Sequence, residues 1–140
     1  MRLLIQSSVN LIFLFLLCVN AFATETIETE NENADWFVKR FSRDLISLTR
    51  DGKVVHFTFK NPGFSLVVDR EYRSDFTLEE GQPFNSGPDD HSFTKYLLKA
   101  VGADGVTIQY ESEFDHRSFG PDKITIDRGT FKLLFTGQPD

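Results

Sequence analysis

The segment VTIQYESEFD (residues 106–115) alternates apolar and polar side chains with a period of two residues. Its apolar side chains share one face of an extended strand: Val106, Ile108, Tyr110 and Phe114. Its acidic and amide side chains fall on the opposite face. One buried face and one face in water are typical of an antiparallel sheet, so this segment predicts a sheet of that kind.

Two hairpins are expected to extend the sheet. Residues 53–59 (KVVHFTF) and 64–69 (FSLVVD) would pair across Asn61-Pro62-Gly63, a sequence that suits a type II turn because proline presets φ and glycine accepts positive φ. Residues 73–78 fit either a third strand or an irregular extension.

The second hairpin is expected near the C-terminus. Residues 123–127 (KITID) and 130–135 (TFKLLF) would pair about a turn at Arg128-Gly129.

Two amphipathic helices are predicted to cover the sheet. The first is capped by Asp35 and runs to about Thr49, with apolar side chains at helical spacing: Phe37, Phe41, Leu45 and Leu48. The second begins at Asp89-Asp90 or Ser92 and runs to about Val101, with one apolar side: Phe93, Tyr96, Leu97 and Ala100.

The order of these elements predicts an α+β fold. We expect a curved antiparallel sheet of about five or six strands, packed on the N-terminal amphipathic helix and on the second helix. The same order occurs in cystatin-like and NTF2-like cones. That comparison rests on element order alone, and no motif in the chain accompanies it.

The N-terminal 23 residues have the layout of a secretory signal peptide. Arg2 precedes the apolar run of residues 11–19 (LIFLFLLCV), and Ala21-Phe22-Ala23 places small residues at a cleavage site. The run is shorter than the ~20 residues that a membrane anchor needs. Cleavage would remove Cys18, the single cysteine, so the secreted or periplasmic product is expected to hold no disulfide and no stable membrane anchor.

The mature chain divides into an acidic leader and one domain. Residues 24–35 (TETIETENENAD) hold five acids and no base and are expected to be disordered. Residues 36–140 form the predicted α+β domain, with 14 basic and 16 acidic side chains. Its net charge is thus about −2, without the basic face that nucleic-acid binding needs.

Phenylalanine dominates the apolar composition of the mature chain. Twelve of the fifteen phenylalanines follow the cleavage site. Each can bury about 150 Å² or more, so together they either fill a core or line an apolar ligand cavity. The expected partner is accordingly a protein or a small apolar ligand, and no cofactor is expected.

Few side chains suggest chemistry. His56 lies opposite the phenylalanines of its strand, and Asp69 on the paired strand could orient it as a general base. Asp89-Asp90-His91 and Asp115-His116 resemble metal ligands in composition but lack the spacing of a zinc site, and no metal is expected.

An acidic row follows one face of the strand predicted over residues 106–115. It consists of Glu111, Glu113 and Asp115. A carboxylate row can bind calcium or act as an acid and base pair, but neutralisation by Lys123 and Lys132 on a neighbouring strand is the simpler expectation.

Three classes of function are compatible with these patterns. The first is a secreted, non-catalytic binding or interaction protein that uses the sheet surface or a cone-shaped pocket. The alternative is a small acid/base enzyme with His56 and Asp69 in that pocket. A secreted structural protein without a ligand is a third class.

Overall fold

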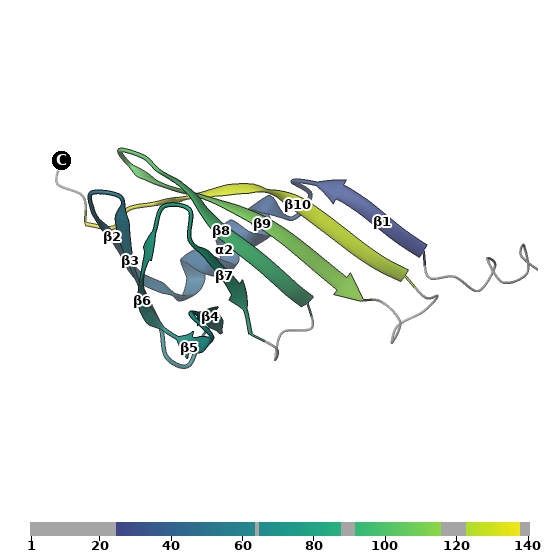
Figure 1. The fold of residues 1–140 in the computed structure, drawn as a ribbon, viewed down its shortest axis with the longest axis horizontal. Coiled ribbons are helices and arrows are strands. Elements are labelled where there is room, and N and C mark those ends of the chain that lie inside the picture. Colours follow the sequence, from purple (N-terminus) through teal and green to yellow (C-terminus); the bar gives the residue numbers. More distant parts are fainter. Residues whose placement is uncertain (1–24, 64, 88–91, 116–122, 138–140) are drawn as a thin grey trace, which may run out of the picture.

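The computed structural model describes residues 25–63, 65–87, 92–115 and 123–137 (Figure 1). Its elements are, in chain order, β1 (Glu25–Glu30), α2 (Ala34–Asp44), β2 (Leu45–Asp51), β3 (Val54–Phe59), β4 (Leu66–Val68), β5 (Glu71–Arg73), β6 (Asp75–Glu79), β7 (Pro83–Ser86), β8 (Ser92–Val101), β9 (Gly105–Asp115) and β10 (Lys123–Leu134).

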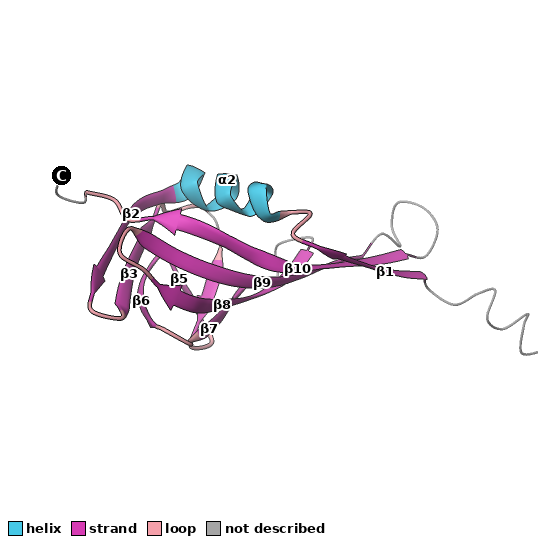
Figure 2. Cartoon of the chain, turned by 90° about the horizontal axis from the view of Figure 1, so that it is seen from above, coloured by secondary structure: helices cyan, strands magenta, loops and turns pink. Residues whose placement is uncertain are grey.

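The described strands form two sheets. The large sheet has the order β1-β10-β9-β8-β7-β4-β5, and the small sheet has the order β2-β3-β6. Figure 2 shows α2 lying on one face of the large sheet, with the small sheet at the end of the molecule opposite β1. The predicted α+β class is therefore confirmed, and the described residues form more strands and fewer helices than expected.

The alternation in residues 106–115 is confirmed as β9. This strand pairs with β8 on one side and with β10 on the other, and both pairings are antiparallel. Val106, Ile108 and Tyr110 are buried on the face that α2 covers. We call this face of the large sheet the helix face, and the opposite one the helix-free face.

The predicted second helix is wrong, because residues 92–101 form strand β8 between β7 and β9. The segment fits the two-residue period of a strand as well as the helical period. Every second residue, Thr94, Tyr96 and Leu98, is buried on the helix face. Hydrogen bonding to two neighbouring strands decides between the two periods, and tertiary context here outweighs local spacing.

The predicted first helix is too long. It ends at Asp44, and Leu45 already has extended dihedral angles. Leu48, which continued the helical spacing, instead lies on β2 opposite Phe57 of β3 and is fully buried there. Asp35 sits in the first turn rather than at the cap, which is Asn33.

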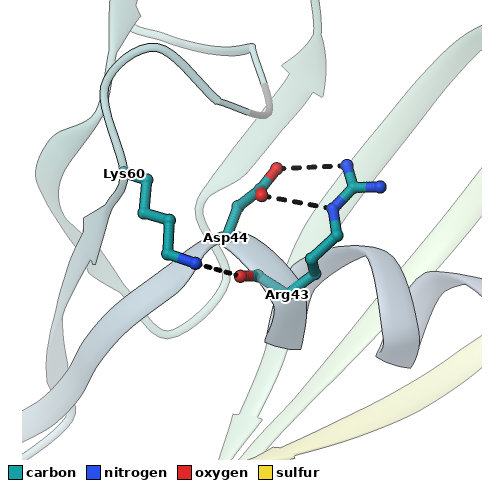
Figure 3. Close-up of polar contacts among 3 residues, drawn as sticks. All are labelled: Arg43, Asp44 and Lys60. Carbon is teal, nitrogen blue, oxygen red and sulfur yellow. Dashed lines mark hydrogen bonds and ion pairs between the residues drawn. The ribbon is translucent and has the colours of Figure 1, made fainter.

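The junction between α2 and β2 is fixed by polar contacts (Figure 3). The Lys60 ammonium donates to the Arg43 carbonyl at 3.0 Å, and the Lys60 amide donates to the Asp44 carbonyl at 2.8 Å. These donors satisfy carbonyls that the end of a helix leaves open. The Arg43 guanidinium donates to the Asp44 carboxylate, from Nε at 3.2 Å. The helix therefore ends where the end of β3 supplies its partners.

The first predicted hairpin is also wrong. β3 pairs with β2 and β6, whereas residues 66–68 form β4 in the large sheet. The Asn61–Pro62 peptide bond is cis, and Gly63 does not adopt a positive φ, so the type II turn is absent there. The chain leaves the small sheet at this point and enters the large one.

The second predicted hairpin is a single strand. β10 runs from Lys123 through Arg128 and Gly129 to Leu134 and pairs with β9 over its length. The Arg-Gly pair resembles a turn in sequence, but the alternation of side chains continues across it.

The predicted disordered leader contains a strand and the start of the helix. β1 pairs in parallel with β10, from Glu25 opposite Lys123 to Glu30 opposite Arg128. Composition alone predicted disorder, because the segment buries little apolar surface. The backbone partners supplied by the edge of β10 account for the difference.

The core lies between α2, the helix face and the inner face of the small sheet. Aromatic rings fill it. Ring centroids lie 4.5 Å apart for Phe37 and Tyr110, 5.2 Å for Phe41 and Phe131, and 5.3 Å for Phe41 and Tyr96. Spacings of this size are those of contacting rings, so this aromatic set packs a core rather than lining a cavity. Phe64 and Phe119 lie outside the described residues.

Candidate functional site

A polar groove of about 520 Å³ lies on the large sheet where β1, β10, β9 and β8 run side by side. Its lining is mainly charged and polar: Glu28, Thr29, Glu30, Lys99, Gln109, Tyr110, Glu111, Arg128, Gly129 and Thr130. Because side chains alternate along a strand, Gln109, Glu111 and Arg128 point away from α2. The groove therefore opens on the helix-free face.

The helix-free face carries a row of alternating charge. Strand register places Glu30 of β1 beside Arg128 of β10, Arg128 beside Glu111 of β9, and Glu111 beside Lys95 of β8. Opposite charges on directly paired positions stabilise a sheet modestly. The row shows how this face tolerates so many charges side by side.

Arg128 is the centre of this row. Its Nε donates to Glu111 Oε2 at 2.9 Å, and its Nη1 lies 3.5 Å from Glu28 Oε1. The hydrogen bond to Glu111 is the largest influence that raises the pKa of the Arg128 guanidinium. The guanidinium thus stays charged and holds carboxylates from two strands on either side of it.

Arg128→Ala is expected to lower the free energy of unfolding modestly, because three glutamates then face one another across the groove. The loss should shrink in about 1 M salt, which screens exposed charges. Chemical denaturation at both salt concentrations measures it. Lys132→Ala, which removes the exposed pair with Asp104, is the control and should change stability less. A loss that salt leaves unchanged would argue against an electrostatic origin.

Directly behind the groove, on the helix face, Asp127 joins β10 to the start of α2. It is 1% exposed. Its carboxylate accepts four hydrogen bonds: from Tyr110 Oη at 2.6 Å, Thr29 Oγ1 at 2.8 Å, the Asn33 amide at 2.8 Å and the Glu32 amide at 3.3 Å. Three of these donors belong to residues 29–33, so Asp127 fixes the path from β1 into α2.

Burial and hydrogen bonding compete at Asp127. Burial is the largest single influence and raises the pKa of the carboxyl, but the hydrogen bonds from Tyr110, Asn33, Thr29 and Glu32 together outweigh it, and the pKa ends below its ordinary value. At Tyr110, burial first and the bond to Asp127 second raise the pKa of the phenol. The pair is therefore held as carboxylate and neutral phenol.

These two shifts predict how stability depends on pH. The lowered pKa of Asp127 contributes stability that is present above about pH 4 and is lost as the pH falls further. The raised pKa of Tyr110 contributes stability that is present below about pH 10 and is lost above it. Urea denaturation across the pH range should show both declines. Tyr110→Phe should make the alkaline decline shallower, and an unchanged decline would contradict the assignment.

Gly129 is required by the close approach of residue 31. A Cβ at position 129 would lie 2.1 Å from Asn31 Oδ1 and 2.9 Å from Tyr110 Oη. Asn31 has a φ of 59°, and its backbone N–H donates to the Arg128 carbonyl at 2.8 Å. Its side-chain Oδ1 accepts a hydrogen bond from the Thr130 backbone N–H at 3.0 Å. The loop after β1 therefore fastens onto β10 beside the groove.

The proposed His56–Asp69 pair is not brought together by the described contacts. His56 lies on the outer face of the small sheet, 47% exposed, and its Nε2 hydrogen-bonds Asp75 of β6. Asp69 lies in the turn after β4, with φ of 51°, and accepts from Gln82 Nε2 at 3.5 Å. The expected pairing failed because β6, rather than residues 64–69, is the neighbour of β3.

Some of the other candidate side chains lie among the described residues, and the rest lie outside them. Glu111 and Glu113 lie on β9 as expected, but Arg128 neutralises Glu111, whereas Lys132 pairs with Asp104. His91, His116 and Asp89-Asp90 lie outside the described residues. Asp115 ends β9.

Within the described ranges, no group of three or more histidine, cysteine, aspartate or glutamate side chains is placed to hold a metal ion. A membrane-spanning helix is likewise absent from residues 25–63, 65–87, 92–115 and 123–137, where no helix is both long and apolar enough.

The sequence pattern does not single out Asp127 and Arg128, because Arg128-Gly129 resembles a turn although it lies inside β10. The available signal was the alternation across it: Thr125, Asp127, Gly129 and Phe131 share one face with Leu133. An aspartate on an otherwise inward-facing row predicts a buried carboxylate with several donors.

Comparison with protein-family models, with curated proteins and with solved structures finds no match to this chain.

Proposed function

We propose that the protein is an exported, non-catalytic binding protein that contacts its ligand on the helix-free face of the large sheet. The observation that carries this proposal is the groove of about 520 Å³ between β1, β10, β9 and β8. On the opposite face, the rings of Phe37 and Phe41 both pack against the ring of Phe131. Room for a ligand is thus found away from the aromatic core.

The chemistry of the groove favours a protein partner over a small apolar ligand. Five charged side chains line it: Glu28, Glu30, Lys99, Glu111 and Arg128. An apolar molecule would desolvate these charges without replacing their contacts with water. A protein surface offers matching charges and hydrogen-bonding groups, as mixed polar interfaces do.

Export is part of the proposal and rests on the pattern of residues 1–23. Cleavage after Ala23 would leave Thr24 as the first residue, one position before β1. Intact mass measurement of the protein isolated from its native source should then correspond to residues 24–140. A mass that includes residues 1–23 would remove export by this route from the proposal.

A cystatin-like or NTF2-like cone remains the finer fold hypothesis. A helix lying across a curved sheet supports it in outline.

The enzyme alternative has weaker support. Acid/base catalysis by His56 requires an orienting carboxylate inside an enclosed site. His56 and its partner Asp75 are both exposed, with 47% and 64% of their side chains open to solvent. The groove, moreover, lies on the large sheet, whereas His56 belongs to the small sheet.

Carboxylate labelling tests the proposed function. The mature protein is treated with a carbodiimide and glycinamide, once purified and once in its native fluid, and labelled sites are compared by mass spectrometry. Glu28, Glu30 and Glu111 should lose labelling in the native fluid, whereas Asp51 and Glu79 of the small sheet should not. Protection of Asp51 and Glu79 with none in the groove would place the ligand elsewhere and overturn the proposal.

A further inference from the structure

β1 is an open edge of the large sheet. It pairs with β10 on one side, and in the described part of the chain no strand lies on its other side. Figures 1 and 2 show β1 at the far end of the molecule, away from the small sheet. The outward peptide groups of such a strand are a ready template for another strand.

The side chains of this edge carry one sign of charge. β1 reads ETIETE, and the segment from residue 24 to residue 33 contains no lysine or arginine. Glu28 is paired with Arg128 across the groove. Glu25 and Glu30 add two further carboxylates at the ends of the strand.

This charge argues against a second copy as the occupant of the edge. Two β1 strands brought together would place glutamates of both copies beside one another, and like charges at paired positions destabilise a sheet. Charged edges are a known protection against self-association. The same charge attracts a strand of the opposite sign.

We infer that the outer edge of β1 binds an extended, lysine- or arginine-bearing segment of a partner protein, which adds to the large sheet as a further strand. The inference rests on the proposed function and names the kind of partner. Backbone pairing along Glu25–Glu30 supplies the contact, and the glutamates supply the preference for basic segments.

Strand periodicity fixes what such a segment should look like. Thr26, Glu28 and Glu30 face the groove side, and alternate basic side chains of the partner would lie beside them. Ile27 faces the helix side and is half-buried. An apolar or β-branched side chain of the partner would pack beside it.

Three eight-residue peptides serve as probes. The first alternates lysine with threonine and valine, the second replaces every lysine with glutamate, and the third is the lysine peptide with alternate backbone nitrogens methylated. Isothermal titration calorimetry measures binding to the mature protein at low salt. Only the first peptide should bind, and its binding should weaken as salt is raised.

Charge reversal on the edge provides the matched test. The double variant Glu28→Lys/Glu30→Lys, which changes the two glutamates on the side that the partner's lysines would occupy, should weaken binding of the lysine peptide about tenfold or more. Asp51→Lys/Glu79→Lys makes the same change in net charge on the exposed small sheet and should leave binding within about twofold.

The outcomes of these experiments distinguish failure of the inference from failure of the proposed function. Equal binding of the glutamate or methylated peptide, equal effects of the two double variants, or a concentration-dependent dimer of the unmodified protein overturns the inference. No binding of the lysine peptide also overturns it, and protection of Glu28, Glu30 and Glu111 in native fluid would then leave the proposed function standing.

Discussion

Asp127→Ala is expected to lower the free energy of unfolding by about 4 kcal/mol, close to the whole stability of many small domains. The substitution leaves four donors without their acceptor: the Tyr110 hydroxyl, the Thr29 hydroxyl and the amides of Glu32 and Asn33. Each buried donor that loses its partner costs roughly 1–3 kcal/mol unless water reaches it. Chemical denaturation at pH 7 measures the loss.

Tyr110→Phe is the graded control for this prediction. It removes one donor and leaves the carboxylate with the other three, so the expected loss is about 1–2 kcal/mol. Hydrogen exchange adds a local readout, because amides of residues 25–33 should lose protection in Asp127→Ala before those of β9 do. A loss below about 1 kcal/mol in Asp127→Ala would show that residues 29–33 are held by other contacts.

Phe41→Ala is expected to lower the free energy of unfolding by about 3–5 kcal/mol. Phe41 is 0% exposed, and its ring contacts those of Phe59, Tyr96 and Phe131, which come from the small sheet and two strands of the large one. Truncation therefore opens a cavity where three elements meet α2. Thermal and chemical denaturation measure the effect.

Phe93→Ala is the matched control, since Phe93 belongs to the same residue type but is 48% exposed. Its loss should stay under about 1 kcal/mol. If Phe41→Ala were as mild as Phe93→Ala, α2 would not be anchored in the core, and the aromatic set would have room for a ligand after all.

The sequence predicts the secondary structure of a segment where its apolar residues fit either the strand period or the helical period, but not where they fit both. Residues 106–115 fit only the period of a strand, and β9 was predicted with the correct buried face. Residues 92–101 fit both periods, because Phe93, Tyr96 and Leu97 recur at helical spacing while Thr94, Tyr96 and Leu98 alternate. Pairing with β7 and β9 selects the strand, and those neighbours cannot be read locally.

The residues of the candidate site are harder to predict from the sequence than the strands are. Gly129 looked like a turn residue, but it is a glycine because Asn31, 98 positions earlier, packs against it. Asp127 acquires its role through donors equally far away in sequence. His56 and Asp69 were paired through a hairpin that does not form, and the true neighbour, Asp75, lies on a strand whose partner was not predicted.

Position-specific photocrosslinking in the native source tests whether the helix-free face is the binding surface. A benzophenone amino acid replaces Gln109, which is exposed in the groove, and in a second variant Thr49, which is exposed on the outer face of the small sheet. Both variants should fold, since neither side chain is buried. We expect a discrete protein adduct from position 109 and none from position 49. Adducts from position 49 alone would contradict the assignment of the helix-free face as the binding surface.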